Sequence, residues 1–202
     1  MRTVRMAAIG VATFLAGSGL QAQTLSGNLT VDDAFFAYIS TNDSVAGTLV
    51  DSSGSSYWYT TQSFSASLTP GTTYYLHIYG KDIFGDVSGF VGSFSLAGTG
   101  FTFANGAQTL LTNSTNWNVS TTGFGTGYFT PVNYGAGALP WGVRQGIDPN
   151  ADWIWTGPKG TLGQAYFSTV IEAAAVPEPS TLALVLPALG LMGLIARRRQ
   201  QR

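Results

Sequence analysis

The chain has 202 residues, of which only 9% are charged and 13% are aromatic, and it contains no cysteine. Low charge with many aromatic residues excludes an intrinsically disordered chain, and the lack of cysteine excludes disulfides and thiolate metal sites. Residues 23–176 carry three basic and nine acidic side chains, a net charge of −6. This balance excludes nucleic-acid binding, because that needs Lys and Arg to neutralise phosphates.

Residues 1–22 have the layout of a secretory signal peptide. Arg2 and Arg5 precede an apolar run over residues 6–20, and small and polar residues follow. The run is short and contains glycines, which favours a cleaved signal over a transmembrane anchor. We expect cleavage after Ala22.

Residues 23–175 predict an all-β ectodomain. Segments with the period of two that strands show alternate with turn clusters rich in Ser, Thr, Asn, Asp and Gly. The predicted strands cover residues 29–40, 72–80, 90–98, 101–106 and 165–173, and the turn clusters lie at 41–44, 51–54, 69–71 and 121–123. Many short strands at such intervals predict a single, jelly-roll-like β-sandwich. Residues 123–150, rich in Gly and Pro, are expected to form one long loop that Trp141 pins in place.

The first predicted strand, residues 29–40, contains two adjacent aspartates. A continuous strand sends neighbouring side chains to opposite faces, so the carboxylates of Asp32 and Asp33 are not expected to act as a pair on one substrate. The period places Leu29, Val31, Asp33, Phe35, Ala37 and Ile39 on one face, and Asp32, Phe36 and Tyr38 on the other.

The domain lacks the sequence signs of an active site. His77 is the one histidine, it lies between Tyr75 and Tyr79 in a predicted strand, and no G-x-S-x-G sequence occurs. Catalysis needs a positioned acid, base, nucleophile or metal. We therefore expect no enzymatic activity and no cofactor.

Carbohydrate binding is a more specific possibility. Aromatic rings offer flat apolar faces to sugars, and Asp, Asn and Gln can fix the hydroxyl groups. The candidate ligand-binding residues are Tyr57, Trp58, Tyr59, Trp117 and Trp141. Trp153 and Trp155, by contrast, share a strand face in the period of two and are expected in the core.

Asp148, Asn150 and Asp152 are a weak candidate for a Ca²⁺ site. Their spacing resembles the first half of a calcium loop. However, Trp153 stands where that loop needs its turn glycine, and Lys159 where it needs its bidentate glutamate. The alternative is a plain turn that leads into the following strand, and no metal site is then expected.

The C-terminal segment, residues 176–202, has three parts in a fixed order. Pro177-Glu178-Pro179 comes first, an apolar helix is predicted over residues 181–196, and Arg197, Arg198 and Arg199 follow. The 15 apolar residues 182–196 span roughly 22 Å at about 1.5 Å per residue, short of a bilayer core of about 30 Å. The arginines favour the cytoplasm and can halt export. We expect a transient membrane anchor.

This segment resembles the PEP-CTERM sorting signal of Gram-negative bacteria, which is also catalogued as the ice-binding protein C-terminal domain. The resemblance implies that Pro177, Glu178 and Pro179 are the sorting motif. It also implies that exosortase, a membrane-embedded transpeptidase, processes the chain and passes it to the cell surface or extracellular matrix. Members of the family are associated with exopolysaccharide and biofilm production.

The ectodomain is loosely similar to galactose-binding-like β-sandwiches. The similarity rests on TVDDAFFAYI (30–39), SLTPGTTYYLHIYGKDIFGDVSGFVGSFSL (67–96), TNSTNWNV (112–119) and ADWIWTGPKGTLGQAYFSTVI (151–171). It implies carbohydrate or protein binding, with no site that transfers by position.

These observations predict an exported, exosortase-processed protein with a structural or adhesive role that is linked to exopolysaccharide or biofilm. The alternatives are a carbohydrate-binding module with a specific glycan and, from another class, a small secreted hydrolase. The expected partners are exosortase and extracellular polysaccharide.

Overall fold

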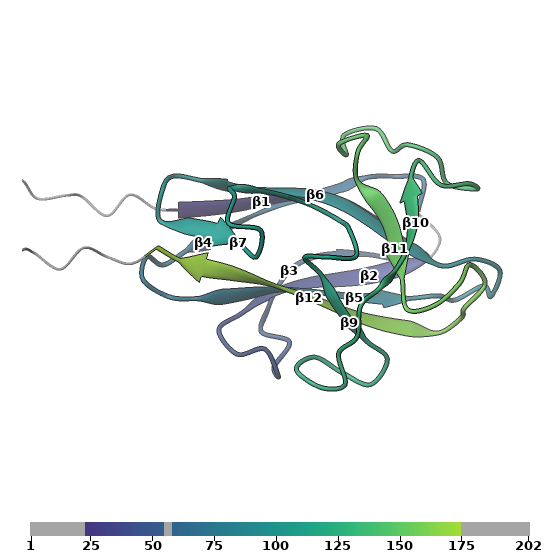
Figure 1. Ribbon diagram of the computed structural model, residues 1–202, viewed down its shortest axis with the longest axis horizontal. Helices are drawn as coiled ribbons and strands as arrows, with labels where there is room; N and C mark the ends of the chain where they lie inside the picture. The colour runs from purple at the N-terminus through teal and green to yellow at the C-terminus, as the bar shows by residue number, and fades with distance from the viewer. Residues whose placement is uncertain (1–22, 55–57, 175–202) are drawn as a thin grey trace, which may run out of the picture.

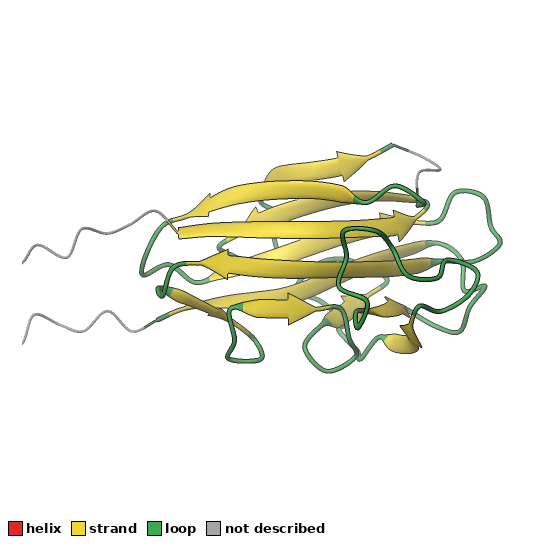
Figure 2. Cartoon of the chain, turned by 90° about the horizontal axis from the view of Figure 1, so that it is seen from above, coloured by secondary structure: helices red, strands yellow, loops and turns green. Residues whose placement is uncertain are grey.

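The computed structural model describes residues 23–54 and 58–174, and in these residues the chain forms strands and loops without a helix (Figure 2). The strands make two six-stranded antiparallel sheets that face each other (Figure 1). The predicted signal peptide and the C-terminal segment lie outside the described residues. None of the described residues forms a helix that could cross a membrane.

The first sheet, called sheet A, is built around β1. Its order is β10 (Val132–Ala136), β11 (Asp152–Trp155), β6 (Gly89–Ala97), β1 (Gln23–Asp32) and β4 (Gln62–Leu68), with β8 (Thr109–Leu111) also paired to β6. β10 lies inside the stretch that was predicted to be one long loop, so that prediction was wrong for residues 132–136. This segment forms an edge strand because its backbone pairs with β11.

The second sheet, sheet B, is built around β5 and β12. Its order is β3 (Thr48–Ser53), β2 (Ala34–Ser40), β5 (Tyr74–Lys81), β12 (Gln164–Ala173) and β7 (Phe101–Phe103), with β9 (Asn118–Ser120) also paired to β12. The predicted turn at residues 51–54 begins later than expected, because Asp51 to Ser53 pair with β2.

The main hydrophobic core fills the space between the two sheets. Phe90 of sheet A lies 4.9 Å from Phe167 of sheet B and 5.3 Å from Trp117, measured between ring centroids. Burying such aromatic side chains dominates the energetics of a core. Of the six residues predicted to share one strand face, all but Asp33 belong to this core: Leu29, Val31, Phe35, Ala37 and Ile39.

The predicted strand 29–40 is in fact two strands in different sheets. β1 ends at Asp32 in sheet A, and β2 begins at Ala34 in sheet B. The chain therefore turns a corner at Asp33. Because both sheets face the same core, the apolar side chains keep their inward direction on both sides of the corner, but strict alternation fails at the corner itself.

A second, smaller core lies on the outer face of sheet A. Trp141 stacks on Trp153 at a centroid distance of 4.6 Å and an interplanar angle of 21°, and Ile147, Ala151 and Val91 complete the cluster. This arrangement confirms Trp141 as the residue that fixes the loop. Trp155 is buried as well, but between the sheets rather than beside Trp153.

The two ends of the described domain lie next to each other. The backbone N–H of Gly100 donates to the Gln23 side chain at 3.3 Å, and the N–H of Ala174 donates to the Gly100 carbonyl at 2.8 Å. Figure 1 shows both ends leaving the sandwich on the left, with β10 and β11 at the opposite end. Since β1 runs from Gln23 to Asp32, the β1–β2 corner lies at the end far from the termini.

Candidate functional site

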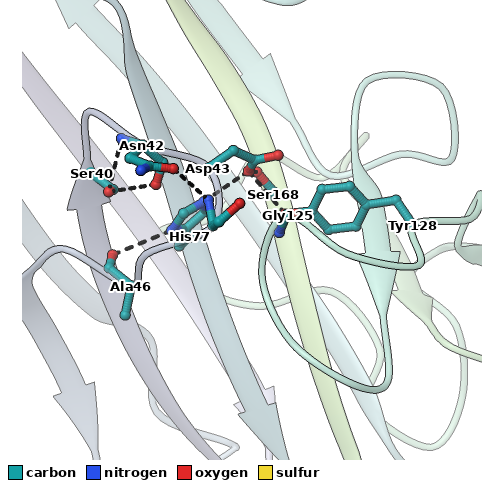
Figure 3. Close-up of polar contacts among 9 residues, drawn as sticks. Ser40, Asn42, Asp43, Ala46, His77, Gly125, Tyr128 and Ser168 are labelled. Carbon is teal, nitrogen blue, oxygen red and sulfur yellow. Dashed lines mark hydrogen bonds and ion pairs between the residues drawn. The ribbon is translucent and has the colours of Figure 1, made fainter.

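One polar network holds two loops against the outer face of sheet B (Figure 3). Asp43 Oδ1 is 3.0 Å from His77 Nε2, and it accepts hydrogen bonds from Tyr128 Oη at 2.9 Å and from Ser168 Oγ at 2.7 Å. His77 lies on β5 opposite Ser168 of β12 in the sheet register. The network therefore joins the loop after β2 and the loop after β9 to the sheet.

His77 is enclosed on every side in this network. Its ring stacks on Phe124 at a centroid distance of 4.1 Å, and its Nδ1 contacts the Ala46 carbonyl oxygen at 3.3 Å. Both ring nitrogens thus face acceptors, and neither contacts the Ser168 hydroxyl. Burial raises the pKa of Tyr128 to about 12, so its hydroxyl remains a hydrogen-bond donor at neutral pH.

A second polar site is an acidic cavity of about 390 Å³ at the end far from the termini. We call it the acidic cavity; the residues that line it include Asp32, Asp33, Asp82, Asp86 and Trp58. The expectation that Asp32 and Asp33 point apart was wrong, because the chain turns between the sheets at this point. Both carboxylates line the same cavity.

Hydrogen bonds fix the aspartates of the acidic cavity. Asp33 Oδ2 accepts from the backbone N–H groups of Ile83 at 2.8 Å and Phe84 at 3.0 Å. Asp32 Oδ2 accepts from Trp141 Nε1 at 2.7 Å. Burial, strengthened by the neighbouring Asp33, raises the pKa of Asp32 to about 7.

A third feature is a row of aromatic side chains on the outer face of sheet B. Phe36, Tyr79 and Tyr166 occupy matching register positions on β2, β5 and β12, and we call them the aromatic row. The centroid distances are 6.1 Å between Phe36 and Tyr79 and 4.9 Å between Tyr79 and Tyr166. Phe36 is 39% exposed, and the other two rings are partly exposed.

The predicted ligand-binding aromatics separate into two groups. Trp117 and Trp141 are each 1% exposed and belong to the two cores, so in this structure neither ring can stack on a sugar. Tyr59 is 59% exposed, and Trp58, in edge contact with it at 6.0 Å, is partly buried. Tyr57 lies outside the described residues. Trp117 packs in the core between the sheets and Trp141 in the smaller core on sheet A, and composition alone could not reveal this.

The aromatic row was not among the predicted candidates. The sequence did contain a sign of it. In the period of two, Phe36 and Tyr79 fall on the strand faces that point away from the core. What the sequence did not reveal was the register that sets β2, β5 and β12 side by side.

The weak Ca²⁺ candidate is a turn in the structure. Asp148 Oδ1 accepts from the Asn150 backbone N–H at 2.9 Å, and Asp152 Oδ2 accepts from Asn133 at 2.6 Å. The two carboxylates thus serve separate local contacts, and β11 follows directly. Across the described residues, no three His, Cys, Asp or Glu side chains already stand as a set of metal ligands.

Comparison with protein families bears on the C-terminal segment. Residues 175–200 match the family model of the PEP-CTERM protein-sorting motif. The chain carries this sorting signal. The match confirms the predicted resemblance and contains Pro177-Glu178-Pro179, the apolar run and the three arginines. The chain is therefore an exported protein that is targeted to exosortase. No curated protein and no solved structure matches the chain.

Proposed function

We propose that the β-sandwich works outside the cell, at the surface or in the extracellular matrix of a Gram-negative bacterium, as a structural or adhesive component. The observation that carries this proposal is the position of the sorting motif. β12 ends at Ala173, and the motif begins at residue 175. Cleavage near the motif would thus release the folded domain whole.

Both chain ends leave the sandwich at the same end, and this position supports a role at a surface. Because Gln23 and Ala174 lie at the same end of the sandwich, a precursor held by its C-terminal segment has that end nearest the membrane. The far end, with the acidic cavity, then points away from the membrane. In this orientation the outer face of sheet B is reachable from the side.

Carbohydrate binding is the second candidate function, and the aromatic row favours it. Aromatic rings on a sheet face can stack on the apolar faces of sugars, and an exposed patch of rings with a polar rim is typical of a binding surface. Gln164, whose Oε1 accepts from Tyr79 Oη at 3.2 Å, gives this surface a polar edge. The resemblance to galactose-binding-like sandwiches implies carbohydrate or protein binding, and this ligand class is one of the two.

The proposal includes no catalytic activity. The Ser168 hydroxyl donates to Asp43 rather than to His77, so the histidine does not contact the oxygen that it would have to activate. In a serine hydrolase the group that takes the hydroxyl proton is a histidine, which the aspartate orients from its other side. This geometry disfavours the hydrolase alternative.

The proposal is tested by fractionating cells that export the full-length chain and contain exosortase. Antibodies against the domain would measure its amount in membrane, matrix and medium. We expect a matrix-bound pool that lacks the C-terminal segment. A domain found only in the medium, with no surface or matrix pool, would contradict the structural or adhesive role.

A further inference from the structure

Most edge strands of the described domain are short or irregular. β7, β8 and β9 have three residues each. The pairing of β10 with β11 shifts register between Asn133 and Gly135, and the pairing of β3 with β2 shifts register between Ala37 and Tyr38. Short strands and bulges are devices that keep the edges of a sheet from pairing with other chains. Each of these five edges carries one of the two.

β4 is the exception among the edge strands. It pairs with β1 from Gln62 to Leu68 without a shift in register, and no described strand pairs with its other side. It contains no proline and no charged residue. Because the backbone groups of a strand point alternately to its two sides, β4 offers a row of unpaired donors and acceptors to its surroundings.

β3 of the other sheet lies beside β4 but does not close this edge. A cavity of about 540 Å³ is lined by residues of both strands, Ala66 and Ser67 on β4 and Thr48 and Val50 on β3. β3 itself carries a half-buried carboxylate, Asp51, opposite a core residue of β2. An inward-pointing charge is a further device that protects an edge. Of the two strands on this side of the sandwich, β3 is therefore protected and β4 is not.

The side chains of β4 fit a second copy of the same strand. In an antiparallel pair with a two-fold axis at Ser65, this residue faces its own counterpart, and Ser63 faces Ser67 of the other copy. All three serines are exposed, on the outer face of sheet A. On the inner face, Phe64 of each copy faces the small Ala66 of the other. Such a pair brings together neither like charges nor two bulky side chains.

We propose that two copies of this chain associate through β4, in an antiparallel pairing centred on Ser65. The pairing continues the hydrogen-bonded ladder that β1 and β4 already form, so that sheet A of one copy runs into sheet A of the other. Because both copies use the same surface, the contact closes on itself and gives a dimer rather than a fibre. This inference goes beyond the proposed function, since it concerns the domain alone and holds wherever the chain is located.

The test uses the full-length chain purified in detergent, and sedimentation equilibrium measures its mass over a range of concentrations. We expect a reversible dimer. In Ser65→Lys two ammonium groups would face each other across the axis, so we expect a dimer dissociation constant about tenfold higher or more. Urea unfolding at low concentration should be unchanged, because Ser65 is exposed. Ser95→Lys is the matched control, since Ser95 is also exposed but lies on β6, away from the edge. It should dimerise as the wild type does.

Cross-linking gives a second measurement that does not depend on charge. The chain has no cysteine, so Ser65→Cys carries a single thiol. Residues directly opposite in antiparallel strands have Cβ atoms about 4.5–5.5 Å apart, and a short bis-maleimide should therefore join two copies. Ser95→Cys lies in the same row of the outer face. It should not cross-link, because β1 and β4 of both copies would lie between the two thiols.

Three results would overturn the proposal. The first is a wild type that stays monomeric at all concentrations. The second is a dimer that persists unchanged in Ser65→Lys, because the contact then lies elsewhere in the chain. The third is equal cross-linking of Ser65→Cys and Ser95→Cys, which would show that the thiols meet by random collision.

Discussion

Ser168 Oγ donates its hydrogen bond to Asp43 Oδ1 at 2.7 Å, although His77 is its direct neighbour in the register of the sheet. Serine, histidine and aspartate thus meet, but the aspartate accepts from both of the others. In a hydrolase the histidine would contact the serine and the aspartate would contact the histidine. Here the aspartate instead holds two loops on sheet B.

Asp43→Ala should destabilise the domain. The substitution leaves His77, Tyr128 and Ser168 without their shared acceptor, and an unsatisfied buried polar group costs about 1–3 kcal/mol. Ser168→Ala, which removes one donor and leaves the acceptor paired with the other two, should cost only about 0.5–1.5 kcal/mol. Urea unfolding measures both. Equal losses in the two variants would contradict the role of Asp43 as the shared acceptor.

Alkaline pH should weaken the fold through two tyrosines. Burial raises the pKa of Tyr128 and of Tyr134 from the ordinary value of 10 to about 12. Between these values the unfolded chain loses the phenolic protons while the folded chain keeps them, so the free energy of unfolding falls as pH rises from 10 to 12. Below pH 10 the two tyrosines are protonated in both states, and their contribution to the free energy of unfolding is fully present.

Urea unfolding at several pH values between 10 and 12 measures how steeply the free energy of unfolding falls with pH. The Tyr134→Phe variant is the comparison. This variant should lose part of the pH dependence, because it lacks one of the two groups. If the pH dependence in Tyr134→Phe equals that of the wild type, Tyr134 has the same pKa in the folded and unfolded chain, which contradicts this prediction.

Gly89→Ala should disturb the stacked tryptophans behind the acidic cavity. A Cβ at residue 89 would lie 2.9 Å from Trp153 and 3.1 Å from Trp141. Overpacking of this kind costs about 1–3 kcal/mol. Tryptophan fluorescence and urea unfolding report the change. Gly54→Ala, which meets no atom within 4 Å, is the control and should unfold as the wild type does.

The aromatic row should carry any binding of matrix polysaccharide. Tyr166→Ala removes one ring of the row on the outer face of sheet B, and an aromatic contact of this kind is worth about 0.5–1.5 kcal/mol. Co-sedimentation with the exopolysaccharide measures retention, which should fall several-fold. Phe84→Ala, at a 67% exposed ring that is not part of the aromatic row, is the matched control. Equal retention in both variants would exclude the row as the binding surface.

The all-β class and the inward faces of the strands could be predicted because the period of two is a local property. The apolar residues from Leu29 to Ile39 that were predicted to share a face all lie in the core, even though the chain changes sheet at Asp33 and Asp33 itself does not. The corner itself could not be predicted, since no glycine or proline marks it in residues 29–40. Its consequence, two aspartates in one cavity, was therefore missed.

The candidate sites were harder to predict, because exposure and register depend on contacts between distant residues. Trp117 and Trp141 look like sugar-stacking residues in loops, yet each is buried in one of the two cores. The acidic cavity joins Asp32 and Asp82, which lie fifty residues apart, and the hydrogen bond from Trp141 adds a third distant segment. The sorting motif was predictable because all its parts are contiguous in the sequence.

The measurement that tests the central claim most directly is the mass of the mature surface form. It is determined for the wild type and for a variant with Pro177, Glu178 and Pro179 changed to Ala, in cells that contain exosortase. We expect the wild type to lack the arginine-tipped segment and the variant to stay full-length in the membrane. A wild-type surface form that retains Arg197–Arg199, or normal processing of the variant, would contradict the account.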